Sequence, residues 1–375
     1  MASSYCAEAI VIGSGPAGLG AALGLARSGI DVVVLEQQDR LGSLRRGETI
    51  RFNQDMEDLL GQGFFEKQVI QKIRKRTYVS HTGKSQVNRE IRNPNNIINW
   101  QDFIQAMAEV VVSAGARVWT GSTVTDILRD GDAVCGVRST VQGFVEEELR
   151  AKAVFSCGGC DDPASRLLNL DRSHIDMPVF KQLLSGYTGP SDRLEYYFHL
   201  GGGGLTIGTI FPRGGEETEI ILLNALKTGT SQPSFDEFKD EHPRFRQRLD
   251  GAMPFYTLKT KIPMGGMLTP ACALPGLVMA GDALGHVQAR GGSGIMTSFL
   301  IGFASGQLGA QAIRSTRWTK DVSDRLNREI HRSPHMRSLR KHNLIYSRLR
   351  MQIFGRIRTP EDMDRYWPFL KVALR

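Results

Sequence analysis

The first 36 residues restrict the fold of this chain more than any other stretch. An apolar run from Ala9 to Ile12 leads into glycines at positions 13, 15 and 18, and an Ala- and Leu-rich segment at 19–28 follows and ends before Gly29. Residues 31–35 form a second apolar run, and Glu36 comes directly after it. The order predicts a buried strand, a tight turn, a helix and a parallel second strand.

The glycine spacing matches the needs of a phosphate-binding turn. Gly13 permits the turn, Gly15 lets backbone N–H groups approach a pyrophosphate, and Gly18 lets the helix pack closely on the strand. The helix N-terminus adds partial positive charge, and Glu36 lies where a ribose hydroxyl would be held. Because strand, helix and acid are all in register, the stretch predicts dinucleotide binding rather than a coincidental glycine-rich turn.

A second stretch, LVMAGDALGHVQARGGSGI at 277–295, raises a question of its own. It places Asp282 after an apolar strand and a glycine, and four more glycines follow. One interpretation is a loose surface turn. The other is a backbone that lies against a flat, phosphate-linked ligand, and the stretch alone leaves both open.

The rest of the chain alternates between two kinds of pattern. Residues 99–115 and 294–313 predict helices, while 123–140, with a turn at Asp130-Gly131, and 145–156 predict strands. The aromatic and aliphatic alternation of 180–226 predicts an antiparallel sheet, 233–250 a helix, and 277–280 a strand that returns to the first lobe. At 375 residues the chain is long enough for two lobes.

Charge and cysteine content limit the cellular location and the binding partners that we expect for the protein. The net charge is +8, and residues 331–358 alternate Arg or Lys with Leu, Ile, Met and Phe. This basic segment indicates either a solvated helix pair packed on the body or contact with an anionic membrane surface, and no recognition module points to nucleic acid. Five scattered cysteines do not form a secreted disulfide framework, and no apolar stretch is long enough to span a membrane, so we expect a cytoplasmic protein with peripheral membrane contact as a second option.

Several motifs together resemble a known family. GSGPAG with Glu36, VMAGDALGHV and GGSGI are similar to the para-hydroxybenzoate hydroxylase-like FAD-dependent oxidoreductases, and most similar to their geranylgeranyl reductase branch. RRGETI at 45–50, YYFHLGGGGLTIGTIFPRGGEE at 196–217 and KIPMGGMLTP at 261–270 support the branch.

The resemblance implies a two-domain α/β fold, a two-dinucleotide-binding-domain flavoprotein. A Rossmann-type FAD-binding domain comprises 1–75, 100–170 and 265–320, an inserted antiparallel-sheet substrate domain comprises 76–99 and 171–264, and 321–375 forms a basic helical segment. The implied cofactor-binding residues are Gly13, Gly15, Pro16, Ala17, Gly18, Glu36, Gln37, Arg45, Arg46, Val124, Gly281, Asp282, Gly292, Gly294 and Ile295.

The sequence also departs from neighbouring branches. Hydroxylases carry an Asp-Gly pair where this chain has CGGC, with Gly158 in place of the aspartate. Their helical arginine is replaced here, with Trp100 at that position, and the tryptophan pair that halogenases carry beside the Phe-Pro box is missing. The reductase branch often has a cysteine near SLRRGE, which is missing too. The departures from the hydroxylases and halogenases favour the reductase interpretation, whereas the missing cysteine is a departure from the reductase branch itself.

The reductase resemblance implies reduction of carbon–carbon double bonds in an apolar, prenyl- or lipid-like substrate, with NAD(P)H or another reductant as electron donor. An FAD-dependent monooxygenase of an aromatic or polyketide substrate and a flavin electron-relay protein are the alternatives. Glu48, His199 and Tyr197 are candidate catalytic groups, although His199 also fits a core position and Glu48 a surface ion pair. His286, after the Gly-Asp pair, is a further candidate for contact with flavin or substrate.

Cys157 and Cys160 form a C-x-x-C pair. Two ligands do not make a structural zinc site without partners, and no partners are apparent in the sequence, so we predict no metal site. The alternatives are small residues required for close packing after a buried strand, or a redox-active disulfide.

Overall fold

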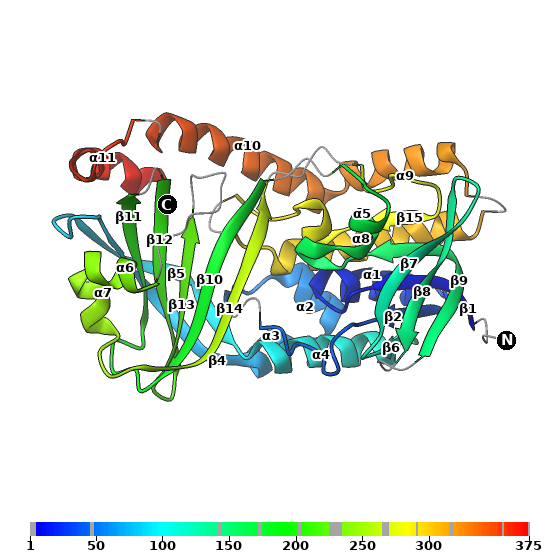
Figure 1. The fold of residues 1–375 in the computed structure, drawn as a ribbon, viewed down its shortest axis with the longest axis horizontal. Coiled ribbons are helices and arrows are strands. Elements are labelled where there is room, and N and C mark those ends of the chain that lie inside the picture. The colour runs from blue at the N-terminus through cyan, green and yellow to red at the C-terminus, as the bar shows by residue number, and fades with distance from the viewer. Residues whose placement is uncertain are drawn as a thin grey trace.

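Two β-sheets occupy the two halves of an elongated molecule, and long helices run between them (Figure 1). The computed structural model describes residues 5–45, 49–141, 145–171, 175–201, 204–224, 235–264, 270–289, 292–315, 318–354 and 356–373. The predicted two-lobed α/β architecture is confirmed. Helices and strands keep the labels of Figure 1.

The first sheet contains the predicted strand–helix–strand unit. Its order is β6 (Arg117–Trp119), β2 (Val32–Leu35), β1 (Tyr5–Ile12), β9 (Val145–Ser156), β8 (Ala133–Val141) and β7 (Thr123–Asp130), and β15 (Leu277–Met279) pairs with β9. The pairs β6–β2, β2–β1, β1–β9 and β9–β15 are all parallel. Continuous burial of β2 and β15 fits the apolar runs in the sequence, because strands of a parallel sheet are covered on both faces.

Helices α1 (Pro16–Arg27) and α8 (Ile295–Ile313) cross at very short range. A Cβ added at Gly302 or Gly306 would lie 2.2 Å from the carbonyl oxygen of Ala17 or Ala21, respectively. Only glycine at these positions lets the two backbones approach so closely. The crossing therefore joins the N-terminal and late parts of the chain into one core, which also includes α4 (Trp100–Ser113).

The second sheet is mostly antiparallel and forms the other half of the molecule. Its order is β14 (Met253–Met264), β10 (Ile175–Ser185), β13 (Glu217–Asn224), β12 (Gly204–Gly214), β11 (Arg193–Gly201), β4 (Val69–Val79), β5 (Gln86–Ile98) and β3 (Thr49–Ile50). Helices α6 (Phe235–Glu241) and α7 (Pro243–Arg248) cover one face, which we call the outer face. There Phe238 and Phe245 pack against Ile210, Ile220 and Leu222.

Two sequence expectations change in detail. The predicted domain boundary at residue 76 falls inside β4, which pairs with β5 from Val69 onward, and the short strand β3 already pairs with β5 at residues 49–50. The helix predicted at 233–250 is two helices that meet at His242. Pro243 disfavours helical geometry at the residue before it, and it occupies the first turn of α7 instead.

The C-terminal helices hold the two halves together. Helix α9 (Lys320–Arg332) packs on α8, α10 (Pro334–Phe354) runs along the molecule, and α11 (Pro360–Ala373) covers the end of β11 and β4 (Figure 1). There Met363 and Trp367 pack against Tyr78 and Phe198. Among the described residues no helix combines the length and apolar character that crossing a membrane requires.

The shorter helices close the loops at the strand ends. They are α2 (Gln54–Leu60), α3 (Phe64–Gln68), α5 (Pro163–Leu167) and two 3₁₀ turns, η1 (Gly159–Asp161) and η2 (Gly281–Leu284).

Candidate functional site

Four parallel strands end at the same edge of the first sheet. Gly13 follows β1, Glu36 follows β2, Cys157 follows β9, and Gly281 comes shortly after β15. Ligands of open α/β sheets bind at the carboxyl ends of the strands, where the direction of winding reverses. Here the chain winds from β1 to β2 on one side, while β9 lies on the other side of β1.

The two glycine-rich stretches, more than 250 residues apart, meet at this edge. Gly281 has a φ of +73°, and a Cβ added there would lie 2.5 Å from the Cβ of Ala17. A Cβ on Gly294, at the start of α8, would lie 3.5 Å from Oδ1 of Asp282. The stretch at 277–295 is therefore not a loose surface turn.

The three glycines of the first turn have separable roles. A Cβ on Gly13 would be 2.7 Å from the carbonyl oxygen of Cys157, and one on Gly18 would be 1.9 Å from the carbonyl oxygen of Gly13. A Cβ on Gly15 would meet no atom within 4 Å. Packing thus requires the first and third glycines, while the second faces open space, as expected if a ligand occupies it.

Two helix N-termini face the site without side-chain caps. Helix α1 begins after Gly15 with Pro16 at its first turn, and α8 begins after Gly294. The N-cap residues are Gly15 and Gly294, and neither has a side chain that could cap its helix. Such ends favour negative charge, so both suit phosphate or another anionic group.

Glu36 is held in place by several donors. One carboxylate oxygen accepts from the backbone N–H of Ser14 at 2.9 Å and from the Ser14 hydroxyl at 2.6 Å, and the other accepts from Gln38 N–H at 2.9 Å. Its backbone carbonyl accepts from Ser122 N–H, two residues before buried Val124. Gln37 is exposed next to it. The segment around Glu36 is therefore fixed to the glycine turn and to the start of β7.

His286 stabilises the second stretch from behind. The side chain is 1% exposed, and its Nδ1 accepts from the backbone N–H of Gly281 at 3.2 Å. Burial, together with a smaller effect of the nearby His331, lowers the pKa of His286 to about 3. The imidazole is thus neutral and positions the Gly281–Asp282 turn.

This buried imidazole predicts a pH-dependent stability. Since the pKa of His286 falls from 6.5 in the unfolded chain to about 3 in the folded one, the unfolded state takes up the proton first. The contribution of His286 to the free energy of unfolding is complete above pH 6.5. It is lost on acidification, by up to about 1.4 kcal/mol per pH unit. His286→Asn keeps an acceptor near the same place but does not titrate. Urea unfolding at pH 7.5 and 5.5 should show that this variant loses less unfolding free energy between the two pH values than wild type does. Equal losses in the two proteins would contradict the assignment.

Asn343 of α10 holds the next few residues. Its side-chain oxygen accepts from Ala289 N–H at 2.8 Å, and its amide nitrogen donates to the Val287 carbonyl at 2.9 Å. Gly292 then passes close to the second sheet, because a Cβ there would lie 2.8 Å from Cδ1 of Ile262. The glycine-rich stretch thus bridges the two sheets.

The inner face of the second sheet, opposite α6 and α7, carries buried charge. Lys181 and Glu219 form an ion pair of 3.0 Å in which each side chain is 1% exposed. Arg213 is also buried, and burial together with the positive charge of Arg45 lowers the pKa of its guanidinium. Arg45 N–H donates to the Tyr256 hydroxyl at 3.2 Å, so the first residue of RRGETI lies against β14. Arg46 and Glu48 lie outside the described residues.

Tyr197 and His199 lie on the outer face. The Tyr197 hydroxyl donates to Glu195 at 2.7 Å, and Glu195 also accepts from Arg248 at 3.1 Å. His199 lies beside Glu241 and near two further histidines, His81 and His242, and burial lowers the pKa of His199 and brings that of His242 to about 3. The structure therefore groups these two candidates with each other but not with the glycine-rich stretches.

The C-x-x-C pair is buried beside the glycine turn. Cys157 N–H donates to the Ile12 carbonyl at 2.9 Å, and neither Cys157 nor Cys160 forms a disulfide. Burial raises the pKa of the Cys157 thiol, which disfavours the reactive thiolate. Asp162 organises the same loop: its carboxylate accepts from Ser156, from Gly158 N–H and from Ser165. Close packing explains the small residues.

Comparison with known proteins agrees with this geometry. The digeranylgeranylglycerophospholipid reductase 2 of Methanococcoides burtonii is 24% identical over 321 residues, which cover 82% of this chain and 75% of that protein. The corresponding reductase of Methanosarcina acetivorans is 26% identical over 335 residues, covering 82% and 76%. A profile of the FAD dependent oxidoreductase family matches residues 8–162. Over residues 8–162 the chain is therefore similar to the FAD dependent oxidoreductases, and over about four-fifths of its length it is similar to these reductases.

The fold of this chain matches a solved structure along its entire length. A geranylgeranyl bacteriochlorophyll reductase-like protein from Thermoplasma acidophilum superposes with a TM-score of 0.83 at 16% identity, covering 100% of this chain and 92% of that chain. FAD also fits the residues at the strand ends. Open space at Gly15, two uncapped helix N-termini and the acid after β2 are the features that a dinucleotide requires.

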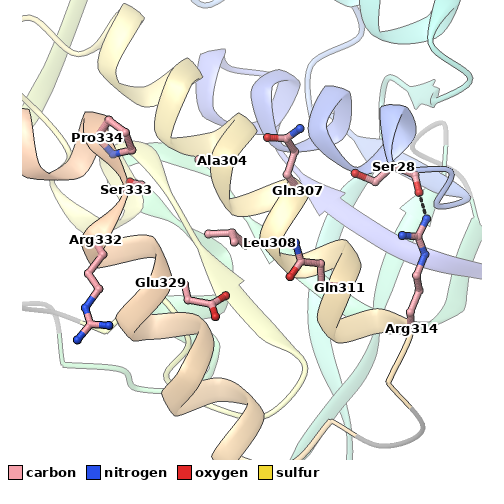
Figure 2. A pocket seen from close by; sticks show the side chains of 10 residues that line it. All are labelled: Ser28, Ala304, Gln307, Leu308, Gln311, Arg314, Glu329, Arg332, Ser333 and Pro334. Carbon is pink, nitrogen blue, oxygen red and sulfur yellow. Dashed lines mark hydrogen bonds between the residues drawn. The ribbon is translucent and has the colours of Figure 1, made fainter.

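A separate surface groove lies away from this edge (Figure 2). It has a volume of about 530 Å³ and lies between the C-terminal half of α8 and α9, where Gln307, Gln311 and Glu329 line it. Arg314 closes one end by donating to the Ser28 carbonyl. None of its lining residues belongs to the predicted flavin site, which is built at the other end of α8.

Sequence reasoning missed several residues that shape the site. Asn343, Asp162 and the Lys181–Glu219 pair are separated from the motifs in sequence, and their roles depend on three-dimensional neighbours. Only Asp162 carries a readable local signal, since an Asp before Pro163 is typical of a helix N-cap.

Proposed function

We propose that this oxidoreductase reduces carbon–carbon double bonds in the prenyl chains of an apolar, phospholipid-like substrate. The main support is the likeness to digeranylgeranylglycerophospholipid reductases, which extends over about four-fifths of the chain and so includes the second sheet. NAD(P)H or a comparable reductant is proposed as the electron donor. Bound FAD, once reduced by that donor, would supply the hydride for the double bond.

In this proposal the residues at the strand ends hold and tune the cofactor. Gly15 and the α1 N-terminus accept the pyrophosphate, Glu36 holds a ribose hydroxyl, and Asp282 contacts the linking chain. The α8 N-terminus at Gly294 and Ile295 would stabilise negative charge on the reduced ring system. Its first turn lacks an acidic side chain that would cancel this effect.

The inner face of the second sheet is the proposed boundary of the substrate site. Tyr256 and Arg45 contact each other there, and the Gly292 segment reaches the same sheet through Ile262. Glu48, three residues after Arg45, remains our proposed proton donor. Tyr197 and His199 are less suited to that role, because both face α6 and α7 on the outer side.

The reaction can be tested directly. Chemically reduced, oxygen-free protein is mixed with a digeranylgeranyl phospholipid, and flavin absorbance is followed together with the product mass. The proposal predicts rapid flavin reoxidation and a gain of two hydrogens per double bond. Reoxidation only by oxygen, accelerated by an aromatic compound that becomes hydroxylated, would instead support the monooxygenase alternative.

We also propose that α10 contacts an anionic membrane surface, where such a lipid substrate resides. Arg337, Arg340 and Lys341 are exposed, and Leu344 and Ile345 beside them are 63% and 51% exposed. Basic residues next to exposed apolar ones are typical of interfacial helices, and each basic residue near an anionic surface contributes about 1 kcal/mol.

Sedimentation with vesicles tests this contact. Binding should be stronger to phosphatidylserine-containing than to neutral vesicles, should weaken with salt, and should fall when Leu344 and Ile345 are both replaced by Asp. Equal recovery of wild type and this variant with anionic vesicles would argue against α10 as the contact.

A further inference from the structure

Among the residues that the structure describes, three histidines from distant parts of the sequence meet at the outer face of the second sheet. His81 follows β4, His199 lies on β11, and His242 joins α6 to α7. One ring nitrogen from each lies within 4.8 Å of those of the other two. The ring centroids of His81 and His199 are 4.9 Å apart, and His242 lies 5.5 and 5.6 Å from them.

A carboxylate lies beside this group, next to His199. Oε2 of Glu241 lies 3.1 Å from Nδ1 of His199. Two ligands bound to one tetrahedral zinc ion at 2.0–2.2 Å are roughly 3.3 Å apart, so these two atoms already have the spacing of ligands to a shared ion. The Glu241 side chain is 53% exposed, which leaves a path for an ion from solvent.

Two of these histidines are buried, and one has a nitrogen that lacks a hydrogen-bond partner. His199 and His242 are each 4% exposed, and Nε2 of His242 is buried without a hydrogen-bond partner. Buried polar atoms are nearly always paired, and an unpaired one calls for an explanation such as an ion. Phe238 packs against His199 and His242, so apolar surroundings enclose the inner side of the group.

From this arrangement we propose a zinc site formed by His199, His242 and Glu241, with His81 as the fourth ligand. Imidazole and carboxylate groups are ordinary zinc ligands, and four of them around one ion match a closed, structural site. Nδ1 of His81 currently accepts from Leu200 N–H at 2.9 Å. His81 therefore joins the ion by giving up that hydrogen bond, and it is the weakest of the four ligands.

The site would have a structural role. It connects α6 and α7 to β11 and to the turn after β4, and the same turn contacts α11 through His81 N–H to Met363 and Thr82 to Asp364. In Figure 1, β11 and α7 lie at the opposite end of the molecule from β1. Zinc would thus hold the far end of the second sheet together and take no part in flavin chemistry.

The test uses untagged, EDTA-treated full-length protein and Zn²⁺ in competition with a colorimetric chelator. Wild type should bind one zinc per chain, and His242→Gln should weaken binding by about 100-fold or more. His81→Gln should weaken it less, because its ligand nitrogen must first leave Leu200. His335→Gln, a half-buried histidine of α10 outside the group, is the matched control and should bind as wild type does.

Two further measurements distinguish loss of the zinc site from misfolding of the variant. Flavin content of His242→Gln should equal that of wild type, because the flavin site lies in the other half of the molecule. Co²⁺ added to wild type should give the intense visible absorption of a tetrahedral ion, and Zn²⁺ should remove it. Failure of wild type to bind zinc, or unchanged binding by a His242→Gln protein that retains flavin, would overturn the proposal.

Discussion

Gly15→Ala is expected to lower the affinity for FAD by roughly 10- to 100-fold while the fold remains intact. A Cβ at this position meets no protein atom within 4 Å, and the φ of −68° suits alanine, so the flavin-free chain should lose only about 1 kcal/mol or less of its free energy of unfolding. The added methyl group would occupy the space that a pyrophosphate needs. Overpacking at such a contact costs about 1–3 kcal/mol, which corresponds to the expected loss of affinity.

Gly18→Ala provides the contrast three residues away. There a Cβ would lie 1.9 Å from the Gly13 carbonyl oxygen, a contact that backbone must move to relieve. We expect a loss of about 3 kcal/mol or more in the stability of the flavin-free chain. Flavin titration and urea unfolding of both variants check the pair. If Gly15→Ala destabilised the flavin-free chain as strongly as Gly18→Ala, Gly15 would be a packing residue and the interpretation of its open space would be wrong.

Lys181→Met is expected to destabilise the protein by about 3–5 kcal/mol. The substitution leaves Glu219 charged in a position where its side chain is 1% exposed. The double variant Lys181→Met/Glu219→Leu removes both charges and should recover to within about 1 kcal/mol of wild type, or exceed it, because a buried ion pair adds little net stability over an apolar pair.

An exposed pair provides the control for this cycle. Lys72 and Glu66 lie 2.8 Å apart, but their side chains are 40% and 73% exposed. Lys72→Met should therefore change stability by about 1 kcal/mol or less. A loss for Lys181→Met as small as that for Lys72→Met would show that water reaches the inner-face pair. Full flavin reoxidation by prenyl lipid in the stable double variant would show that the pair serves structure and not catalysis.

The sequence predicted the flavin-binding half well because its signals are local. Strand, glycine turn, helix and acid follow one another within 36 residues, and each has a direct physical requirement that the structure displays at Gly13, Gly15 and Gly18. The role of Asp282 depended on a family resemblance, since a strand followed by Gly-Asp is compatible with a simple turn. The contact between Gly281 and Ala17 then decided between the two interpretations.

The second sheet was harder to predict in detail. Alternation along β11 indicates that Tyr197 and His199 share one face, but it does not say whether that face meets the flavin side or a pair of helices. Helices α6 and α7 cover that face, and their own sequence suggested one continuous helix. The histidine group could not be predicted from the sequence either, because 118 residues separate His81 from His199 and no zinc-ligand spacing links them.

The most direct test of the central claim is a titration of flavin-free protein with FAD, for wild type, Gly15→Ala and Asp282→Ala. Two stretches that hold one cofactor should give one FAD per chain in wild type and a clear loss of affinity in each variant. A wild-type protein that binds no FAD when FAD is in excess, or an Asp282→Ala variant that binds FAD as tightly as wild type, would contradict the account.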